Sequence, residues 1–386
     1  MTYFANWNFP TNIKVGAGRI RELAELCKSM KIRSPLFITD PGLAALPMVQ
    51  TIIDNLNASG LNCGLFSTIQ ANPTGQNVTD GTAWYLEHHN DGVIAFGGGS
   101  ALDAGKAVAL MVGQDRPIWD FEDVGDNWLR VNVEGMAPVI AVPTTAGTGS
   151  EVGRASVITD QEHHIKKIIF HPNMLPKQVI LDPELTIGLP PSITAATGMD
   201  ALSHNLEAIC SPFYHPMATG IAVEGIRLVQ EYLPQAVADG KNIEARTQML
   251  VCSSMGATAF QKGLGAMHAL AHPLGALYNA HHGMLNAIVM PYVLKANRRE
   301  IESRIERLTQ YMELEEHGFD GFMNWVLMLR EQLGIPHTLA ALDIDDGQAE
   351  TVAQMAVEDP SSGGNPISFS AEEYQQIFRH AVQGVL

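Results

Sequence analysis

The chain has 386 residues and is acidic, with 24 lysines and arginines against 41 aspartates and glutamates and a formal net charge of −17 at pH 7. Hydrophobic residues make up 46% of it and charged residues 17%, which is ample material for packed cores and too little charge for a disordered chain. This balance argues against nucleic acid as a partner, because binding to a phosphate backbone relies on lysine and arginine. We expect a globular protein of two domains.

The sequence predicts neither a leader peptide nor a membrane segment. Met1–Trp7 has no basic region followed by an apolar one, and no uncharged apolar run approaches the roughly 18 residues of a membrane helix. The four cysteines are too few and too scattered for a disulfide framework or a thiolate zinc site; they are Cys27, Cys63, Cys210 and Cys252. The simplest interpretation is a protein of the reducing cytoplasm, with no membrane partner.

Short apolar runs alternate with helical stretches in the first half of the chain. Buried strands that end in turn residues are predicted at 36–39, 92–96 and 138–142. Helices are predicted around 46–56, 79–89 and 101–112. Further short strands are expected near 156–159, 168–170 and 179–181. Strand, turn and helix in repetition predict an α/β domain, in which a parallel sheet carries helices on its faces.

The pattern changes near Gly188–Pro191, after which long helical periodicities replace the strand signals. The helices expected there cover 195–210, 218–233, 243–260 and 300–312. We therefore place the boundary at Leu189, which gives an α/β domain over residues 1–188 and an all-helical domain over residues 189–386.

A glycine-rich turn, Gly97-Gly98-Gly99-Ser100, leaves one predicted strand and opens a helix. Consecutive glycines let the backbone approach a ligand, and the helix N-terminus favours an anion, so a pyrophosphate suits this place. The turn is not the G-x-G-x-x-G fingerprint, since Leu102 stands where the third glycine would fall. An ordinary tight turn is the alternative.

A second polar loop, Pro143–Glu151, also follows a predicted strand and is rich in hydroxyl groups and glycine. Two such loops at the carboxyl ends of parallel strands favour a dinucleotide site of the Rossmann-like kind. Asp40 ends the strand at 36–39, where a carboxylate can meet a ribose. It would then disfavour NADP, since like charges about 4 Å apart repel by roughly 4 kcal/mol at an effective dielectric near 20. Alternatively, Asp40 only begins the turn with Pro41-Gly42.

Histidines and a carboxylate recur at helical spacing in the second half. Asp200 and His204 are four residues apart and so share a helix face; His268 and His272 repeat that step. The pair His281-His282 opens another predicted helix. Burying imidazoles and a carboxylate among apolar residues is costly unless they are paired or bind a metal. The set predicts a site for Fe²⁺, Zn²⁺ or a similar divalent ion; histidines satisfied by packing alone are the other interpretation.

The chain resembles the iron-containing (group III) alcohol dehydrogenase family nearly from end to end. The resemblance rests on Gly97-Gly98-Gly99-Ser100-x-x-Asp103, Pro143–Glu151, Gly198–His204 and His268-x3-His272-x9-His282-Gly283. It implies a dinucleotide-binding domain and a helical domain with the active site in the cleft between them. It further implies NAD and Fe²⁺ as cofactors, a small alcohol or aldehyde as substrate, and a homodimer.

The resemblance also implies roles for individual residues. The metal ligands would be Asp200, His204, His268 and His282. Gly98, Gly99 and Ser100 would contact the pyrophosphate and Asp40 the ribose, and Asp103 completes the glycine motif. The rest of the cofactor groove would be lined by Thr144, Thr145, Thr148 and Lys166, with Asn72 and His272 near the nicotinamide and the substrate. The family commonly has proline where His281 stands, so either histidine of the pair could be the ligand; the interval from His268 favours His282.

Together these features predict an NAD-linked, metal-dependent interconversion of a primary alcohol or diol and its aldehyde. His272 is the candidate proton relay, because imidazole titrates near neutral pH; a packing role is its alternative. Other possibilities within the architecture are a glycerol or lactaldehyde dehydrogenase and a metal-dependent synthase of the dehydroquinate type. A metallohydrolase and a noncatalytic nucleotide or metal sensor are the alternatives from other classes.

Overall fold

The structure, a computed structural model, describes residues 11–163 and 165–386. These residues form two compact units, each with its own contacts. We call residues 11–145 with 149–187 the α/β unit, and residues 146–148 with 188–386 the helical unit. The chain leaves the α/β unit for the last time between Ile187 and Gly188.

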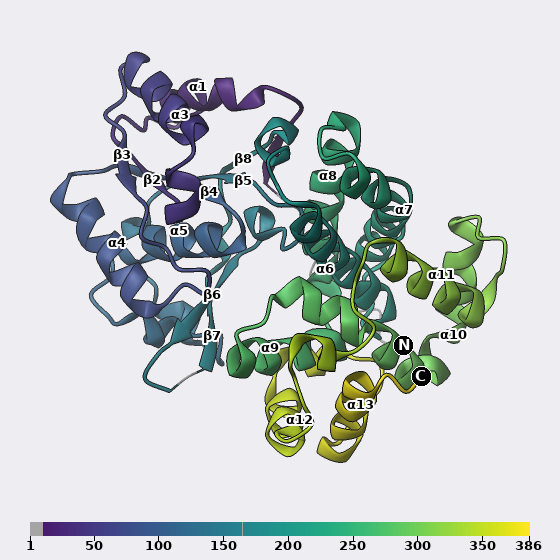
Figure 1. Ribbon diagram of the computed structural model, residues 1–386. Coiled ribbons are helices and arrows are strands. Elements are labelled where there is room, and N and C mark those ends of the chain that lie inside the picture. Colours follow the sequence, from purple (N-terminus) through teal and green to yellow (C-terminus); the bar gives the residue numbers. More distant parts are fainter. Residues whose placement is uncertain (1–10, 164) are drawn as a thin grey trace. The chain divides into compact units, whose positions relative to one another are not determined.

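The α/β unit is built on a six-stranded sheet in which every pair of neighbours is parallel (Figure 1). The strand order is β1-β8-β5-β4-β2-β3. The strands are β1 Asn12–Val15, β2 Pro35–Ile38, β3 Gly64–Phe66, β4 Gly92–Gly97, β5 Val139–Pro143 and β8 Gln178–Leu181. The predicted parallel sheet is confirmed, although the sequence analysis missed β1 and β3.

Helices cover both faces of this sheet. They are α1 Leu23–Ser29, α2 Pro41–Ala44, α3 Pro47–Ala58, α4 Gly75–Glu87 and α5 Gly99–Met111. Side chains of α1 and α3 form one core with Phe37, Ile94 and Ile140. Helix α5 lies against the other face, where Gly105 approaches Ala95. Burial on both faces explains why these strands are continuous apolar runs rather than alternating ones.

The strand order places a topological switch point at β2. From β2 the chain adds β3 on one side and then returns to add β4 on the other. Ligands of open α/β sheets bind at the carboxyl ends of the strands that flank such a reversal. Asp40 follows β2, and the glycine-rich turn follows β4, so both lie where a nucleotide is expected.

Two of the expected strands do not extend the parallel sheet. β6 (Ala155–Asp160) and β7 (Ile165–Phe170) form a separate two-stranded antiparallel sheet. Only four residues connect them, and a connection that short can join antiparallel strands but not parallel ones, which need a long crossover.

The helical unit has no strand within residues 188–386. Its helices are α6 Pro191–Cys210, α7 Pro216–Ala238, α8 Ile243–Ala259, α9 Ala266–Tyr278, α10 His282–Tyr311, α11 Gly318–Gln332, α12 Ala349–Glu358 and α13 Ala371–Gln383. Helix α6 is buried from Thr194 to Cys210 and packs against α7, α8 and α10 (Figure 1). Its polar residues therefore need partners inside the protein.

Helix α10 has 30 residues and is far longer than the 300–312 segment predicted from periodicity. It begins at His282, where a new helix was expected, and continues through the buried Pro291. Its second half carries many charged residues, such as Arg298 and Glu300. Among the helices of the described residues, none combines the length and the apolar character that a bilayer span requires.

Candidate active site

Three predicted metal ligands meet in the interior of the helical unit. Asp200 and His204 project from the same face of α6, and His268 lies in the first turn of α9. All three side chains are buried, and one potential ligand atom from each lies within 4.8 Å of the others. The rings of His204 and His268 stack with centroids 4.7 Å apart. A buried set of one carboxylate and two imidazoles is a donor set that binds Fe²⁺ or Zn²⁺.

The fourth predicted ligand, His282, lies beside this group at the start of α10. Its Nε2 is 3.6 Å from Oδ1 of Asp200, and its side chain is 30% exposed. His281 stands at the N-cap position without a capping hydrogen bond from its side chain, and it is exposed. Of the two neighbours, His282 is therefore the one placed against Asp200, in agreement with the choice made from the interval to His268.

The rings of His204 and His268 are oriented so that their Nε2 atoms can bind one shared metal ion. Nδ1 of His204 faces the carbonyl oxygen of Gly147 at 3.3 Å, and Nδ1 of His268 faces the carboxylate of Glu207 at 2.6 Å. Because each acceptor needs a proton from the ring, each imidazole carries its proton on Nδ1 and its lone pair on Nε2. Histidine ligands of metals are commonly held in this way by an acceptor behind the ring.

Asn286, one turn after His282, shows that the group is rich in acceptors. Its Nδ2 lies 2.9 Å from Oδ1 of Asp200, 3.2 Å from Nε2 of His268 and 3.1 Å from Nε2 of His282. An amide has only two protons for these three acceptors. Its Oδ1 is buried without a hydrogen-bond partner among the described residues. Such an excess of acceptors around one point fits a cation.

The protonation states of Asp200 and His204 also suit a metal. Burial would raise the pKa of Asp200, yet the nearby His204, His282 and His268 hold it at about 2. Burial lowers the pKa of His204 to about 4, although Asp200 opposes the shift. At neutral pH the carboxylate is therefore ionised and this imidazole is neutral, which are the forms that bind a divalent ion.

Gly283 lets α10 approach α6 closely enough to bring His282 to Asp200. A Cβ at this position would stand 2.3 Å from the carbonyl oxygen of Ala196 and 3.1 Å from Cβ of Asp200. The first contact is with backbone, which cannot move aside cheaply.

We expect Gly283→Ala to push the start of α10 away from α6 and to weaken metal binding at least about tenfold, because His282 and Asn286 move with the helix. Competition with a chromophoric chelator measures the effect. Gly220→Ala on α7, where a Cβ would meet nothing within 4 Å, is the matched control and should bind metal normally. Unchanged affinity in Gly283→Ala would contradict this role of the close approach.

The glycine-rich turn forms a cradle in the α/β unit. Gly97 has a φ of 142°, and a Cβ there would stand 2.8 Å from Cβ of Ala101. Gly98 is the N-cap of α5, and no side chain caps this helix, so its first N–H groups can receive an anion. Oγ1 of Thr145 lies 3.4 Å from the position of a Cβ on Gly98, so the two predicted loops meet here.

Other predicted cofactor residues surround this turn. The N–H of Thr144 donates to the carbonyl oxygen of Gly97 at 2.9 Å, and the hydroxyl of Ser100 donates to that of Ala71, beside Asn72. Asp40 accepts from the N–H of Leu43 at 2.9 Å and so caps α2, and its predicted contact with a ribose stays a prediction. Its other carboxylate oxygen lies 3.7 Å from the position of a Cβ on Gly97.

The carboxylate of Asp103 has several partners within the protein. Its carboxylate accepts hydrogen bonds from the Ser150 hydroxyl and the Val157 N–H, and it pairs with Lys106 at 3.2 Å. Its role in binding the cofactor therefore stays a prediction. Burial lowers the pKa of Lys166, while Asp103 opposes the shift.

The loop after β5 belongs to both units. Thr144 and Thr145 lie in the α/β unit, whereas Gly147 and Thr148 belong to the helical unit. Gly147 accepts from the ring of the predicted ligand His204. This loop therefore carries Thr145, which lies beside the glycine-rich turn, and two positions later Gly147, which contacts the predicted metal ligand His204.

His272 lies one turn after His268 on α9. Its Nδ1 is 2.8 Å from Oδ2 of Asp359, and its ring stacks on that of His282 with centroids 5.3 Å apart. The sequence analysis missed three residues of this site: Glu207, Asn286 and Asp359. Glu207 follows His204 by three positions and Asn286 follows His282 by four, so helical spacing was a usable signal for both. Asp359 lies 87 residues from His272, and no local pattern in the sequence connects the two.

Comparison with known proteins decides the family. The model of the iron-containing alcohol dehydrogenases matches residues 10–183, and that of their C-terminal domain matches residues 194–382. A 4-hydroxybutyrate dehydrogenase of Cupriavidus necator is 36% identical over 96% of this chain and 98% of its own. An NAD-dependent methanol dehydrogenase of Bacillus methanolicus is 31% identical over 98% of this chain and 100% of its own. The crystal structure of a 1,3-propanediol oxidoreductase has a TM-score of 0.92 and 32% identity, covering 97% of this chain and 99% of its own.

The chain belongs to the iron-containing alcohol dehydrogenase family. The predicted family, its fold and its reaction class, the interconversion of an alcohol and its carbonyl compound, are thereby confirmed. As an iron-type alcohol dehydrogenase it also fits the cofactors expected from the sequence, since the metal group and the glycine cradle suit a divalent cation and a dinucleotide.

Proposed function

We propose that this dehydrogenase oxidises a short primary alcohol or diol to the aldehyde with NAD⁺, and catalyses the reverse reduction, at a site centred on Asp200, His204, His268 and His282. The observation that carries the proposal is the buried group of acceptors whose ring nitrogens are held from behind. A divalent cation there supplies a Lewis acid for the substrate oxygen, and NAD⁺ supplies the hydride acceptor.

The residues around the glycine-rich turn each bind a different part of the cofactor in this proposal. The N–H groups at the start of α5, with Gly98 and Gly99, bind the pyrophosphate. Asp40 accepts from the adenosine ribose and disfavours a phosphate on it. Thr144, Thr145, Thr148 and Lys166 line the remaining groove, with Asn72 toward the nicotinamide. The switch point between β2 and β4 and the uncapped N-terminus of α5 support this assignment.

His272 moves the proton that the alcohol loses. Asp359 holds its Nδ1, which leaves Nε2 as the atom that accepts and releases the proton. Its stacking on His282 supports this position beside the metal group.

A single assay tests the function. Protein loaded with Fe²⁺ or Zn²⁺ is mixed with NAD⁺ and a panel of primary alcohols and diols, and the absorbance of reduced nicotinamide is followed. We expect reduction that depends on the metal, with 1,3-propanediol and 4-hydroxybutyrate in the panel because relatives carry those names. Cofactor-independent hydrolysis of esters or phosphates, without nicotinamide reduction, would contradict the proposal.

His272→Ala should keep its metal and lose about 10²–10⁴-fold in turnover, because general acid–base catalysis contributes that much. The pH profile of kcat should also change, since the group proposed to accept and release the proton is gone. Elemental analysis and kcat measured across pH check both points. An unchanged profile with full turnover would show that His272 only packs.

We propose further that the protein acts as a homodimer in the reducing cytoplasm. Within residues 11–163 and 165–386, β1 lies at the edge of the parallel sheet and pairs with β8 alone, and such a strand edge is a ready surface for a second copy. All four cysteines are free, which suits a reducing compartment. Light scattering at the peak of a sizing column measures the mass and decides between one copy and two.

A further inference from the structure

We propose that Glu207 is a positioning residue of the metal site: one buried carboxylate caps helix α9 and holds the imidazole of His268 in the tautomer that can bind metal. The inference rests on the proposed function, because it assigns a role toward the same metal. Glu207 lies on α6 one turn after His204, and its side chain is 3% exposed. A carboxylate buried this deeply requires strong partners.

Both oxygens of Glu207 face the first turn of α9. Oε1 accepts from the N–H of Met267 at 2.7 Å and lies 3.4 Å from the nitrogen of His268. Oε2 accepts from Nδ1 of the His268 ring at 2.6 Å. The N-cap of α9 is Gly265, which has no side chain to satisfy these N–H groups. Glu207 therefore serves as the missing cap and adds a negative charge at the positive end of the helix dipole.

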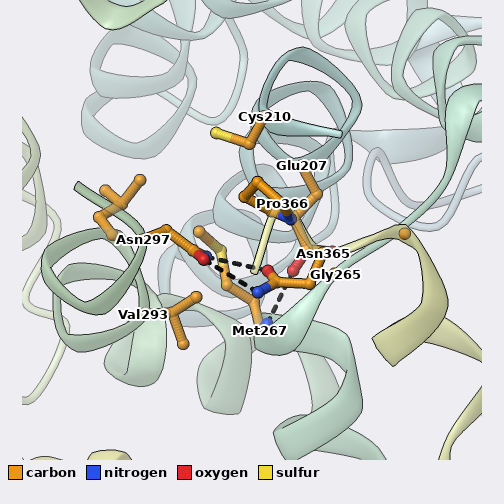
Figure 2. Close-up of a pocket in the computed structure, with 10 residues that line it drawn as sticks. Glu207, Cys210, Gly265, Met267, Val293, Asn297, Asn365 and Pro366 are labelled. Atoms are coloured by element: carbon orange, nitrogen blue, oxygen red, sulfur yellow. Dashed lines mark hydrogen bonds between the residues drawn. The ribbon is translucent and has the colours of Figure 1, made fainter. Parts of the chain in front are cut away.

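The surroundings fix the start of α9 against Glu207. In Figure 2, Asn297 and Asn365 form a reciprocal pair of amide hydrogen bonds, each 2.9 Å long, beside a small pocket that Glu207 and Met267 also line. Oδ1 of Asn365 also accepts from the N–H of Ala266 at 3.1 Å. The first backbone N–H groups of α9 are thus held by side chains from other elements, so the helix cannot shift without losing them.

The contact to the ring decides what His268 can do. With its proton donated to Glu207 from Nδ1, the ring keeps a lone pair on Nε2, the atom that lies 3.2 Å from Nδ2 of Asn286 and 4.0 Å from Oδ1 of Asp200. The opposite tautomer would place a proton on Nε2 and close that position to a metal. Glu207 thus acts on the metal only through His268.

Glutamine cannot replace Glu207 in both tasks. If its oxygen caps Met267, its NH₂ group faces Nδ1 of His268 and favours the tautomer with the proton on Nε2. If its oxygen accepts from the ring, its NH₂ group meets the N–H of Met267, and the cap is lost. Only an ionised carboxylate offers acceptors in both directions. Glu207→Gln, which has nearly the same size, therefore isolates the hydrogen-bonding pattern.

The test compares metal affinity rather than activity alone. Zn²⁺ affinity is measured by competition with a chromophoric chelator, and Co²⁺ is added separately to record its d–d absorption. We expect Glu207→Gln to bind Zn²⁺ about 10–100-fold more weakly and to change the Co²⁺ spectrum, while NAD⁺ binding stays as in the wild type. Equal Zn²⁺ affinity with an unchanged spectrum would overturn the inference.

Asp182→Asn is the matched control. Asp182 is a fully buried carboxylate of the α/β unit that accepts from the N–H groups of Gly18, Ile20 and Glu184 but from no imidazole. Asp182→Asn should lower the free energy of unfolding and leave Zn²⁺ affinity unchanged. This result would separate the loss of backbone hydrogen bonds from the loss of the contact that orients His268.

A second measurement covers the case in which Glu207→Gln does not fold. In ¹⁵N-histidine-labelled wild-type protein without metal, the His268 ring should show its proton on Nδ1; a proton on Nε2 would overturn the inference. A wild-type protein that binds no Zn²⁺ would instead contradict the proposed function. Zn²⁺ binding that is equal in the wild type and in Glu207→Gln would contradict only the role of Glu207.

Discussion

His268→Ala is expected to abolish stoichiometric metal binding and to slow nicotinamide reduction by about a thousandfold or more. The substitution removes a buried residue that we propose as a metal ligand, and it leaves the carboxylate of Glu207 without the ring proton that it accepts. Lewis-acid stabilisation of the reacting oxygen contributes several kcal/mol, and each 1.36 kcal/mol corresponds to a factor of ten in rate. Elemental analysis of the purified variant and stopped-flow absorbance of the reduced cofactor measure the two effects together.

His317→Ala is the matched control, because His317 is exposed and makes no side-chain cap at the start of α11. It should retain metal and rate. If His268→Ala kept full metal occupancy and normal turnover, the assignment of the ligands would be wrong.

Asp103→Ala is expected to lower the free energy of unfolding by about 3–5 kcal/mol, the usual cost of leaving a buried charge, here that of Lys106, without its ionic partner. Lys106 is 1% exposed, and among the described residues its ammonium group would keep only the carbonyl oxygen of Ala155 as a partner. The N–H of Val157 in β6 would also lose its acceptor. Urea denaturation at neutral pH, followed by circular dichroism, measures the change.

The double variant Asp103→Ala/Lys106→Met separates the causes. Methionine fills a similar volume without a charge, so about half or more of the lost stability should return. A single variant within about 1 kcal/mol of the wild type would show that the pair contributes little. NAD⁺ affinity of the double variant also decides whether Asp103 belongs to the cofactor site, as the glycine motif suggested.

Local patterns in the sequence were sufficient to predict most of the α/β unit. β4 and β5 are uninterrupted apolar runs followed by glycine or hydroxyl residues, so both the strand and its turn are visible. β1 and β3 are short edge strands of four and three residues with partly exposed side chains, and they lack that signal. β6 and β7 were recognised as strands, but their pairing depends on the short connection between them.

The helical periodicity of the sequence predicted the positions of the helices better than it predicted their lengths. The start of α10 and its polar second half were both predicted, but not as one helix, because Pro291 and the uniformly buried first half hide the helical period between them. Interior prolines usually break helices, so its continuation past Pro291 depends on packing in the helical unit rather than on local propensity.

The metal group was predictable because its members stand at helical intervals in an apolar context. The residues that orient them were not singled out, since a glutamate or asparagine on a helix is ordinarily a surface residue. Glu207 and Asn286 acquire their roles only when α6, α9 and α10 are packed together. Asp359 depends on a contact between segments far apart in the chain, for which one sequence carries no local signal.

In the proposed reaction, the carbon of the alcohol transfers its hydride directly to the nicotinamide, and the transfer depends on a metal ion at the predicted ligands. The most direct measurement uses an alcohol deuterated at the reacting carbon and follows the label by mass spectrometry of the cofactor in a single turnover. We predict that reduced cofactor carries one deuterium when the protein is loaded with metal, and that transfer stops after chelation and resumes on reloading. Unlabelled reduced cofactor, or transfer at the same rate in metal-free protein, would contradict the account.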